Sequence, residues 1–493
     1  LLIACINYVL LSTSQALERS LEVGIRKITG ATRRALFNQV LTESFLITLI
    51  AFPLSLILIE QARPLIISLM GKEFIHYGSD PKIIFGLLFV LFFVTYLPGL
   101  FTVRYFSKIT PIVALNGEKI PGTRRHSVKK FLITLQFVIF LILVSTSLGI
   151  YKQINYSKNH ELGFEPENIL TFNIGMNPEV KKSYNSFKKE LLSHANISCV
   201  SGGMWVPPTS GKMSMSFKRK DKADDFINVE GLYVDKDFLK TMGIKLLQGK
   251  SLSDFGNNFD RKILINEKAK EVLGFDEPIG QKLWMGEIVG IVEDFHYHSF
   301  REDIPPMFLI GGNHMVREIL VKTSSGNTKS AEAFINEKLS EFDGSEELTI
   351  TLLEDRFKTI YRNERKLAFL IAVFAGIAIF IAAMGLLGLT IFTLKKRTKE
   401  IAIRKVNGAR SYHIFKLISI TYIRLILISL VISIPISYFL LDKWLQDFAY
   451  KTTISWWIFG VAGITALVIT LLTISLKTMR AANRNPVESL RYE

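Results

Sequence analysis

The chain has 493 residues, of which 49% are hydrophobic, and its mean hydropathy is +0.28. This apolar content is higher than soluble globular domains usually carry, so it argues against a soluble protein and predicts membrane-spanning helices. The net charge of +16 could fit a nucleic-acid binder, but the basic residues do not form one face, and we expect no nucleic-acid partner.

Seven apolar stretches follow one another along the chain. A helix needs about 20 apolar residues to span the hydrocarbon layer, because its backbone must bond internally there. A buried core helix is the alternative for any single stretch, but seven in one chain favour a multi-pass α-helical membrane protein with seven transmembrane helices. The stretches are 1–16, which is cut short, 35–59, 83–106, 131–151, 367–394, 414–441 and 456–476.

Lysine and arginine are concentrated in alternate connections: after the first stretch, between the third and fourth, between the fifth and sixth, and after the last. The connections at 60–82 and 442–455 are nearly charge-balanced, and Trp444, Trp456 and Trp457 flank the second of them. Basic loops stay in the cytoplasm and tryptophan collects at membrane interfaces. This pattern places the polar segment 155–363 on the outer side of the membrane.

The polar segment has the length of a domain. Short runs typical of strands, at 263–266 and 287–292, alternate with stretches typical of helices, at 183–194 and 330–342. We therefore expect an α+β domain inserted between two membrane helices.

One motif occurs twice. Residues 22–31 read Glu-Val-Gly-Ile-Arg-Lys-Ile-Thr-Gly-Ala, and residues 400–409 read Glu-Ile-Ala-Ile-Arg-Lys-Val-Asn-Gly-Ala, aligned without a gap. Pro53 and Pro435 lie in the next helix of each copy, and 110–115 echoes 485–490. The repeat predicts two related units, with a leading helix and a first outer domain missing before Leu1.

The charges of the motif suit a short basic helix. Glu22 with Arg26, and Glu400 with Arg404, are acid-to-base pairs of the favoured i,i+4 polarity. Positive charge beside anionic lipid would explain the basic residues, but it does not explain why glutamate, isoleucine and glycine repeat in register. We favour a protein-docking role over lipid attraction alone.

Glycine and hydroxyl residues mark where these short helices should end and the next ones begin. Gly30 and Gly408 suit the left-handed position after a helix, and Thr32 or Ser411 could cap the following helix.

These motifs resemble those of the FtsX-like permeases of ABC transporters. In that family the loop signature at 22–31 lies against the ATPase subunit, and the Pro-x-x-Ala-Leu pattern at 111–115 is also typical. Ala402 stands where the first copy has Gly24, and 412–414 differ from 34–36. Four segments of the outer domain resemble the MacB-type periplasmic core domain: 243–249, 265–267, 278–280 and 289–296.

The resemblance implies six regions. They are a first FtsX-like unit with three helices at 1–116, a cytoplasmic linker at 117–130, a transmembrane helix at 131–151, a MacB-like periplasmic core domain at 152–366, a second FtsX-like unit with three helices at 367–479, and a cytoplasmic tail at 480–493.

Enzyme chemistry is not indicated. The sequence has no Gly-x-x-x-x-Gly-Lys-Ser/Thr loop, and 326–330 is only a superficial echo of one. His296 and His298 lie near Glu293 and Asp294, but a structural strand is the preferred interpretation over a metal site. We expect no catalytic residue, metal or cofactor in this chain, with ATP and Mg²⁺ bound by a partner ATPase.

Within the apolar stretches, small and kinking residues stand out. Ala372, Gly376, Ala378, Ala382, Gly385 and Gly388 suit close helix packing, although ordinary membrane-helix composition would also explain them. Pro53, Pro98 and Pro435 are expected to kink their helices. Few polar residues interrupt these stretches: Asn7, Gln39, Glu43, Gln136 and Arg424. A hydrophilic channel through the bilayer is therefore disfavoured.

The resemblance implies a non-catalytic permease subunit of the cell inner membrane, in which a separate ATPase changes the shape of the outer domains, a mechanism called mechanotransmission. The expected partners are two copies of the ATPase, membrane lipid, and a periplasmic adaptor or outer-membrane channel. The expected docking residues are Glu22, Arg26, Lys27, Gly30, Glu400, Arg404, Lys405 and Gly408.

Export of a drug, peptide or lipid-linked substrate is the first hypothesis for its function. The alternatives are lipoprotein release, control of a cell-wall hydrolase, and a membrane receptor or scaffold that works without ATP. A neighbouring ATPase gene would favour a transporter over a receptor.

Overall fold

A computed structural model describes residues 2–482 except 19–21, 23–24, 27, 71–80, 107–123, 160–161, 176–177, 210, 212, 219–225, 284, 300, 325, 344–348, 361 and 397. The chain forms two compact units. The helical unit comprises Leu1–Tyr151, Lys366–Lys443 and Thr453–Glu493, and the inserted domain comprises Lys152–Arg365 together with Trp444–Thr452.

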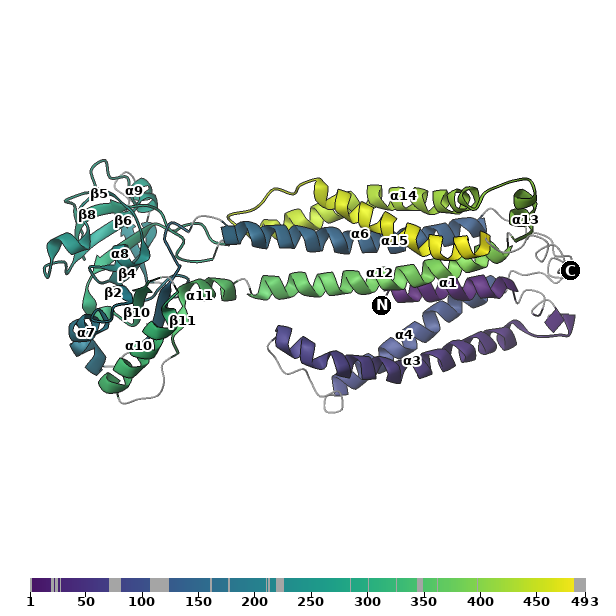
Figure 1. The fold of residues 1–493 in the computed structure, drawn as a ribbon, viewed down its shortest axis with the longest axis horizontal. Coiled ribbons are helices and arrows are strands. Elements are labelled where there is room, and N and C mark those ends of the chain that lie inside the picture. Colours follow the sequence, from purple (N-terminus) through teal and green to yellow (C-terminus); the bar gives the residue numbers. More distant parts are fainter. Residues whose placement is uncertain are drawn as a thin grey trace. The chain divides into compact units, whose positions relative to one another are not determined.

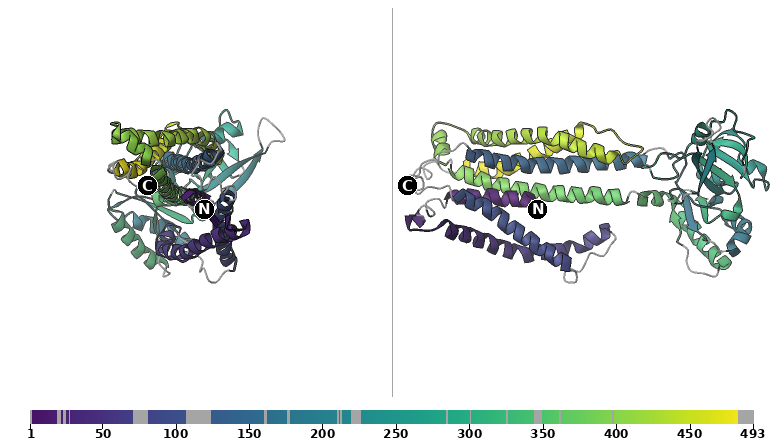
Figure 2. Two further views of the ribbon diagram at one scale, coloured as in Figure 1. Left: turned by 90° about the vertical axis from the view of Figure 1, so that its right-hand side faces the viewer. Right: turned by 180° about the vertical axis from the view of Figure 1, so that it is seen from behind.

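Long helices make up the helical unit. Figures 1 and 2 show α6, α12 and α15 running lengthwise together, with α1 alongside α12. The helices are α1 (Leu2–Glu18), α3 (Arg33–Met70), α4 (Pro81–Phe106), α6 (Arg124–Asn159), α12 (Arg362–Lys396), α13 (Thr398–Val406), α14 (Ser411–Leu445) and α15 (Trp457–Ala482).

Five of these helices are long and apolar enough to cross a membrane within the described residues. They are Phe37–Pro64, Val128–Ser157, Glu364–Leu394, Ser411–Leu445 and Trp457–Ser475. The expected spans at 1–16 and 83–106 correspond to shorter apolar helices, Leu2–Ser14 and Pro81–Tyr96. Five of the seven expected spans are therefore confirmed by length and composition among the described residues, and those at 1–16 and 83–106 stay predictions.

The core of the helical unit joins both copies of the repeat. Ile6 and Leu10 of α1 share one buried cluster with Leu141 of α6, Leu386 of α12 and Ala462 of α15. Because α1 belongs to the first copy and the other helices to the second, this cluster holds the two copies together.

The expectation that the small residues of α12 serve close helix packing is confirmed for some of them. Ala378 and Ala382 are buried, and Gly385 and Gly388 face side chains of α1, whereas Ala372 and Gly376 are exposed. Only the C-terminal half of the stripe is therefore a helix–helix contact.

The inserted domain is built on one mixed sheet, whose order is β11-β1-β10-β2-β4-β9-β6-β8-β5, with β3 on β4 and β7 on β8. β4 with β9 and β6 with β8 are parallel, and the other pairs are antiparallel. The strands are β1 (Ile169–Asn173), β2 (Ile197–Gly203), β3 (Met213–Lys218), β4 (Phe226–Val234), β5 (Leu246–Gly249), β6 (Lys262–Asn266), β7 (Lys282–Leu283), β8 (Gly286–Val292), β9 (Met307–Gly311), β10 (Glu318–Thr323) and β11 (Thr351–Leu352).

Helices cover the sheet because its strands are apolar on both faces. Along β10, Ile319 and Val321 pack under α7 and α10, while Leu320 between them points to the opposite core. Figure 1 shows α7 and α10 side by side next to β2 and β10. The helices of the domain are α7 (Pro178–Leu191), α8 (Phe238–Met242), α9 (Glu267–Leu273), α10 (Thr328–Asp343) and α11 (Leu353–Ile360).

The secondary structure expected for this segment is confirmed at four places. The runs at 263–266 and 287–292 are β6 and β8, and the stretches at 183–194 and 330–342 overlap α7 and α10. The chain is thus a membrane protein with an inserted α+β domain.

Candidate functional site

The first copy of the repeated motif lies between α1 and α3. Arg26 contacts Glu22 at 2.9 Å and donates from its other terminal nitrogen to Gln39 Oε1 at 3.0 Å. Both charged side chains are about half exposed. The pair is therefore available to a partner, and Gln39 fixes the guanidinium against the start of α3.

The second copy forms α13, and its ion pair has the same geometry. Arg404 contacts Glu400 at 2.9 Å, again with both side chains about half exposed. Ile401 and Ala402 are buried, and Ile401 belongs to the core of the helical unit. One side of α13 is thus anchored to the bundle while the ion pair stays accessible.

Both motifs end in the same way. The N–H of Ala31 donates to the carbonyl of Arg26, the N–H of Ala409 donates to that of Arg404, and the glycine before each alanine has a positive φ, 96° at Gly30 and 87° at Gly408. This is the bond pattern of a helix that closes on a left-handed residue, as expected for these glycines.

Thr32 caps the helix that follows the first motif, because its hydroxyl accepts the N–H of Ala35 at 3.2 Å at the start of α3. Ser411, the other expected cap, is itself the first residue of α14. The first expected cap is therefore present.

Each loop also exposes two apolar side chains that are not among the docking residues predicted from the sequence. Ile25 and Ile28 are 48% and 57% exposed, and their matched residues Ile403 and Val406 are 49% and 66% exposed. An apolar β-branched residue at i and i+3 of a basic helix, isoleucine at both positions in the first copy and isoleucine then valine in the second, is the signal that identifies them. Each loop therefore presents an exposed apolar pair beside an ion pair.

The structure describes some of the other residues singled out in the sequence and not others. Lys27 lies outside the described residues, as do the 110–115 and 485–490 motifs. Lys405 is half-buried, and its carbonyl accepts the N–H of Gly408 at 2.9 Å. Pro53 and Pro435 lie inside α3 and α14, and Pro98 lies inside α4. The expected kinks at these prolines stay predictions.

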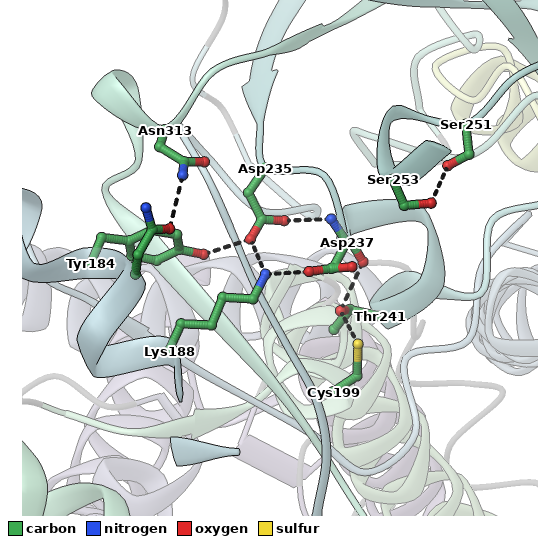
Figure 3. Close-up of polar contacts among 10 residues, drawn as sticks. Tyr184, Lys188, Cys199, Asp235, Asp237, Thr241, Ser251, Ser253 and Asn313 are labelled. Atoms are coloured by element: carbon green, nitrogen blue, oxygen red, sulfur yellow. Dashed lines mark hydrogen bonds and ion pairs between the residues drawn. The ribbon is translucent and has the colours of Figure 1, made fainter. Parts of the chain in front are cut away.

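The inserted domain contains a buried polar cluster, drawn in Figure 3. Lys188 of α7 donates to Asp235 and to Asp237, each at 2.6 Å, and the Tyr184 hydroxyl donates to Asp235 at 2.7 Å. Burial opposes the ammonium charge, but the attraction of Asp235 and the hydrogen bonds to both carboxylates outweigh it and raise the pKa of Lys188. The cluster fastens α7 to the turn between β4 and α8.

The two histidines considered as metal ligands have separate partners. The ring of His298 lies between Glu230 Oε2 and the carbonyl of Thr209, both at 2.7 Å. His296 packs edge-on against the ring of Tyr450, with centroids 4.7 Å apart. These side chains are used in contacts within the domain.

The connection between α14 and α15 belongs to the inserted domain. Arg301 contacts Glu364 at 2.8 Å, stacks on the ring of Phe448 with its guanidinium carbon 4.9 Å from the centroid, and accepts the N–H of Ala449 on its carbonyl. Arg301 therefore joins the base of α12 to the segment Trp444–Thr452.

Gln153, near the end of α6, holds the same segment. Its Nε2 donates to the carbonyl of Tyr450 at 2.8 Å, and its Oε1 accepts the N–H of Thr452 at 2.8 Å. Both ends of the Gln153 amide are thus paired with backbone, a geometry that fixes the position of the connection.

Comparison with known proteins gives two matches to one family. The profile described as FtsX-like permease C-terminal matches residues 1–111 and again residues 372–486. The two matches contain the two copies of the repeated motif.

Curated proteins that are similar to this chain include permease proteins of ABC transporters. One is the macrolide export ATP-binding/permease protein MacB of Chromobacterium violaceum, 23% identical over 305 residues, which are 58% of this chain and 46% of that protein. Another is the uncharacterized ABC transporter permease YknZ of Bacillus subtilis, 24% identical over 334 residues, 64% of this chain and 83% of that protein. The chain spans about half the length of the MacB relatives that it matches.

Among solved structures, the chain is similar to the periplasmic region of MacB from Actinobacillus actinomycetemcomitans. The identity is 19%, the match covers 40% of this chain and 94% of that one, and the TM-score is 0.29.

Proposed function

We propose that this chain is the permease subunit through which a separate ATPase drives the inserted domain. The two FtsX-like profile matches and the MacB and YknZ relatives support an FtsX/MacB-type permease of an ABC transporter. The observation that carries the proposal is the pair of equivalent loops. Each presents the same ion pair, the same exposed apolar pair and the same glycine-closed end.

The loops have the properties that an ATPase contact needs. Ile403 and Val406 can bury apolar area in a partner, while Glu400 and Arg404 set orientation by charge. Ile401 ties α13 to the bundle core, so a force on the loop reaches α12 and α14. In the first loop, Ile25 and Ile28 offer the same kind of apolar area, and Glu22 and Arg26 the same kind of charge pair. Two loops imply two ATPase copies, which bind ATP and Mg²⁺.

Force reaches the inserted domain through the chain itself. α6 and α12 both continue from the helical unit into the domain, and the α14–α15 connection is held within the domain by Arg301 and Gln153. Three connections therefore transmit helix movement to the domain, which is the mechanotransmission that we propose.

The names of the relatives support a proposal for the substrate class. Because the MacB proteins are named for macrolide export, we propose export of a drug, peptide or lipid-linked substrate from the inner membrane, with the inserted domain on the extracytoplasmic side. A periplasmic adaptor or outer-membrane channel would complete such a path.

Charge reversal in both loops tests the docking role. Arg26→Glu together with Arg404→Glu places two carboxylates side by side in each loop and removes the cation offered to the ATPase. We expect the variant to insert into the membrane normally and to lose co-purification with the ATPase, identified by mass spectrometry from its P-loop peptide.

Arg63→Glu is the matched control, because Arg63 forms a similar ion pair with Glu60 at 2.7 Å on α3, away from the loops. The control should retain the ATPase. If the double variant retains the ATPase as well as the control does, the docking assignment is wrong.

A further inference from the structure

The two copies of the repeat can be aligned residue by residue through the helix that precedes each loop. Because Glu22 matches Glu400 without a gap, Asn7 of α1 matches Gly385 of α12. α1 and α12 are thus the same helix of the two units, and Asn7 and Gly385 occupy the same position in it.

These two matched positions are in contact with each other. Asn7 is 9% exposed, and its Nδ2 donates to the carbonyl of Ile381 at 3.2 Å. A Cβ on Gly385 would overlap the Asn7 side-chain oxygen. The Asn7 amide therefore occupies the space that a side chain at 385 would need.

A second pair of matched positions shares one partner about two turns further along the helices. Lys129 of α6 donates to Ser14 at 2.9 Å and lies over the ring of Phe392 at 5.3 Å from its centroid, and Phe392 is the match of Ser14. Between the two levels, Leu11 packs where a Cβ on Gly388 would overlap it. Matched positions that touch at one level and share a partner at the next are what an approximate two-fold axis between the units would produce.

We propose that the Asn7–Gly385 pair determines which units pair. It favours contact between the two different units over contact between two identical ones. Two first units facing each other at this axis would bring two asparagines into space that holds one. Two second units would bring two glycines and leave that space empty. Only the unlike pair fills it, because packing at close helix contacts is sensitive to single groups.

The polar character of Asn7 supports a specificity role over a stability role. Its Oδ1 is buried without a hydrogen-bond partner among the described residues. An unpaired amide oxygen in apolar surroundings is unfavourable, and a single buried asparagine at a helix seam is a known way to specify the partner at a cost in stability.

Exchange of the two residues tests this pairing preference in the full chain. Gly385→Asn, or the smaller Gly385→Ala, overfills the contact, Asn7→Gly empties it, and the double variant Asn7→Gly with Gly385→Asn restores one asparagine and one glycine. We expect each single change to lower the thermal unfolding midpoint of the purified chain, and the exchange to recover most of that loss.

Pairing of identical units is read out by disulfide trapping. In a background of Cys5→Ala and Cys199→Ala, Ser14→Cys gives a covalent dimer on a gel only when two first units from different copies meet at the axis. We expect no dimer with Asn7 and Gly385 present, a dimer in the single variants, and no dimer in the exchange variant.

Gly376→Asn is the matched control for placing asparagine on α12, because a side chain at 376 meets nothing within 4 Å. It should give no dimer. The proposal is overturned if the exchange variant is as unstable as the single changes combined, or if no single change produces a dimer. Neither measurement involves the ATPase, so the result is independent of the proposed function.

Discussion

Lys188 shows how one side chain fixes a helix to a sheet. It reaches from α7 to Asp235, whose side chain is 2% exposed, and to Asp237. Removing one member of such a buried group leaves a desolvated charge behind, and the penalty is about 3–5 kcal/mol. The cluster is therefore a point at which the inserted domain is sensitive to a single substitution.

We predict that Lys188→Met destabilises the inserted domain by an amount of this order. The measurement is the thermal unfolding midpoint of the purified chain, followed by intrinsic fluorescence. Lys189→Met is the matched control, because Lys189 is the next residue of α7 and is exposed. Equal midpoints for the two variants would contradict the prediction.

At the scale of elements, the α14–α15 connection is tied to the base of α12 by Arg301 and to α6 by Gln153. The ion pair of Arg301 is partly exposed and is worth at most about 1 kcal/mol, and its stacking on Phe448 adds a similar amount. These contacts are strong enough to order a short segment and weak enough to break in the helix movement that we propose.

We therefore predict that Arg301→Ala loosens Trp444–Thr452 without unfolding the domain. Hydrogen exchange followed by mass spectrometry should show faster exchange in this segment and unchanged exchange in β9 and β10. Lys245→Ala is the control, because it removes an exposed ion pair to Glu293 elsewhere in the domain. Slow exchange of the segment in Arg301→Ala would show that Arg301 does not hold it.

At the scale of the whole molecule, local patterns could be predicted and distant pairings could not. The Glu400–Arg404 pair and the positive φ of Gly408 follow from spacing within one turn, and β6 and β8 follow from short apolar runs. Lys188 and Asp235 meet only because the sheet brings α7 beside the end of β4. Nothing in the local sequence of either residue specifies that contact.

The placement of the chain across the membrane gives a further prediction. Lys245→Cys in the inserted domain should react with an impermeant maleimide in intact cells whose outer membrane is permeabilised, whereas Val406→Cys in α13 should react only after the inner membrane is broken. Both positions are exposed and the native Cys5 and Cys199 are buried, so the background is low. Labelling of Val406→Cys in intact cells would contradict the predicted orientation.

The overlap of a Cβ at 385 with Asn7 also predicts an evolutionary constraint on these two positions. A duplicated gene begins with identical halves, and either half can then pair with a copy of itself. Under the proposed pairing, a larger side chain at 385 requires a smaller one at 7, so the two positions constrain each other. In an alignment of relatives with the same two units, these two columns should covary.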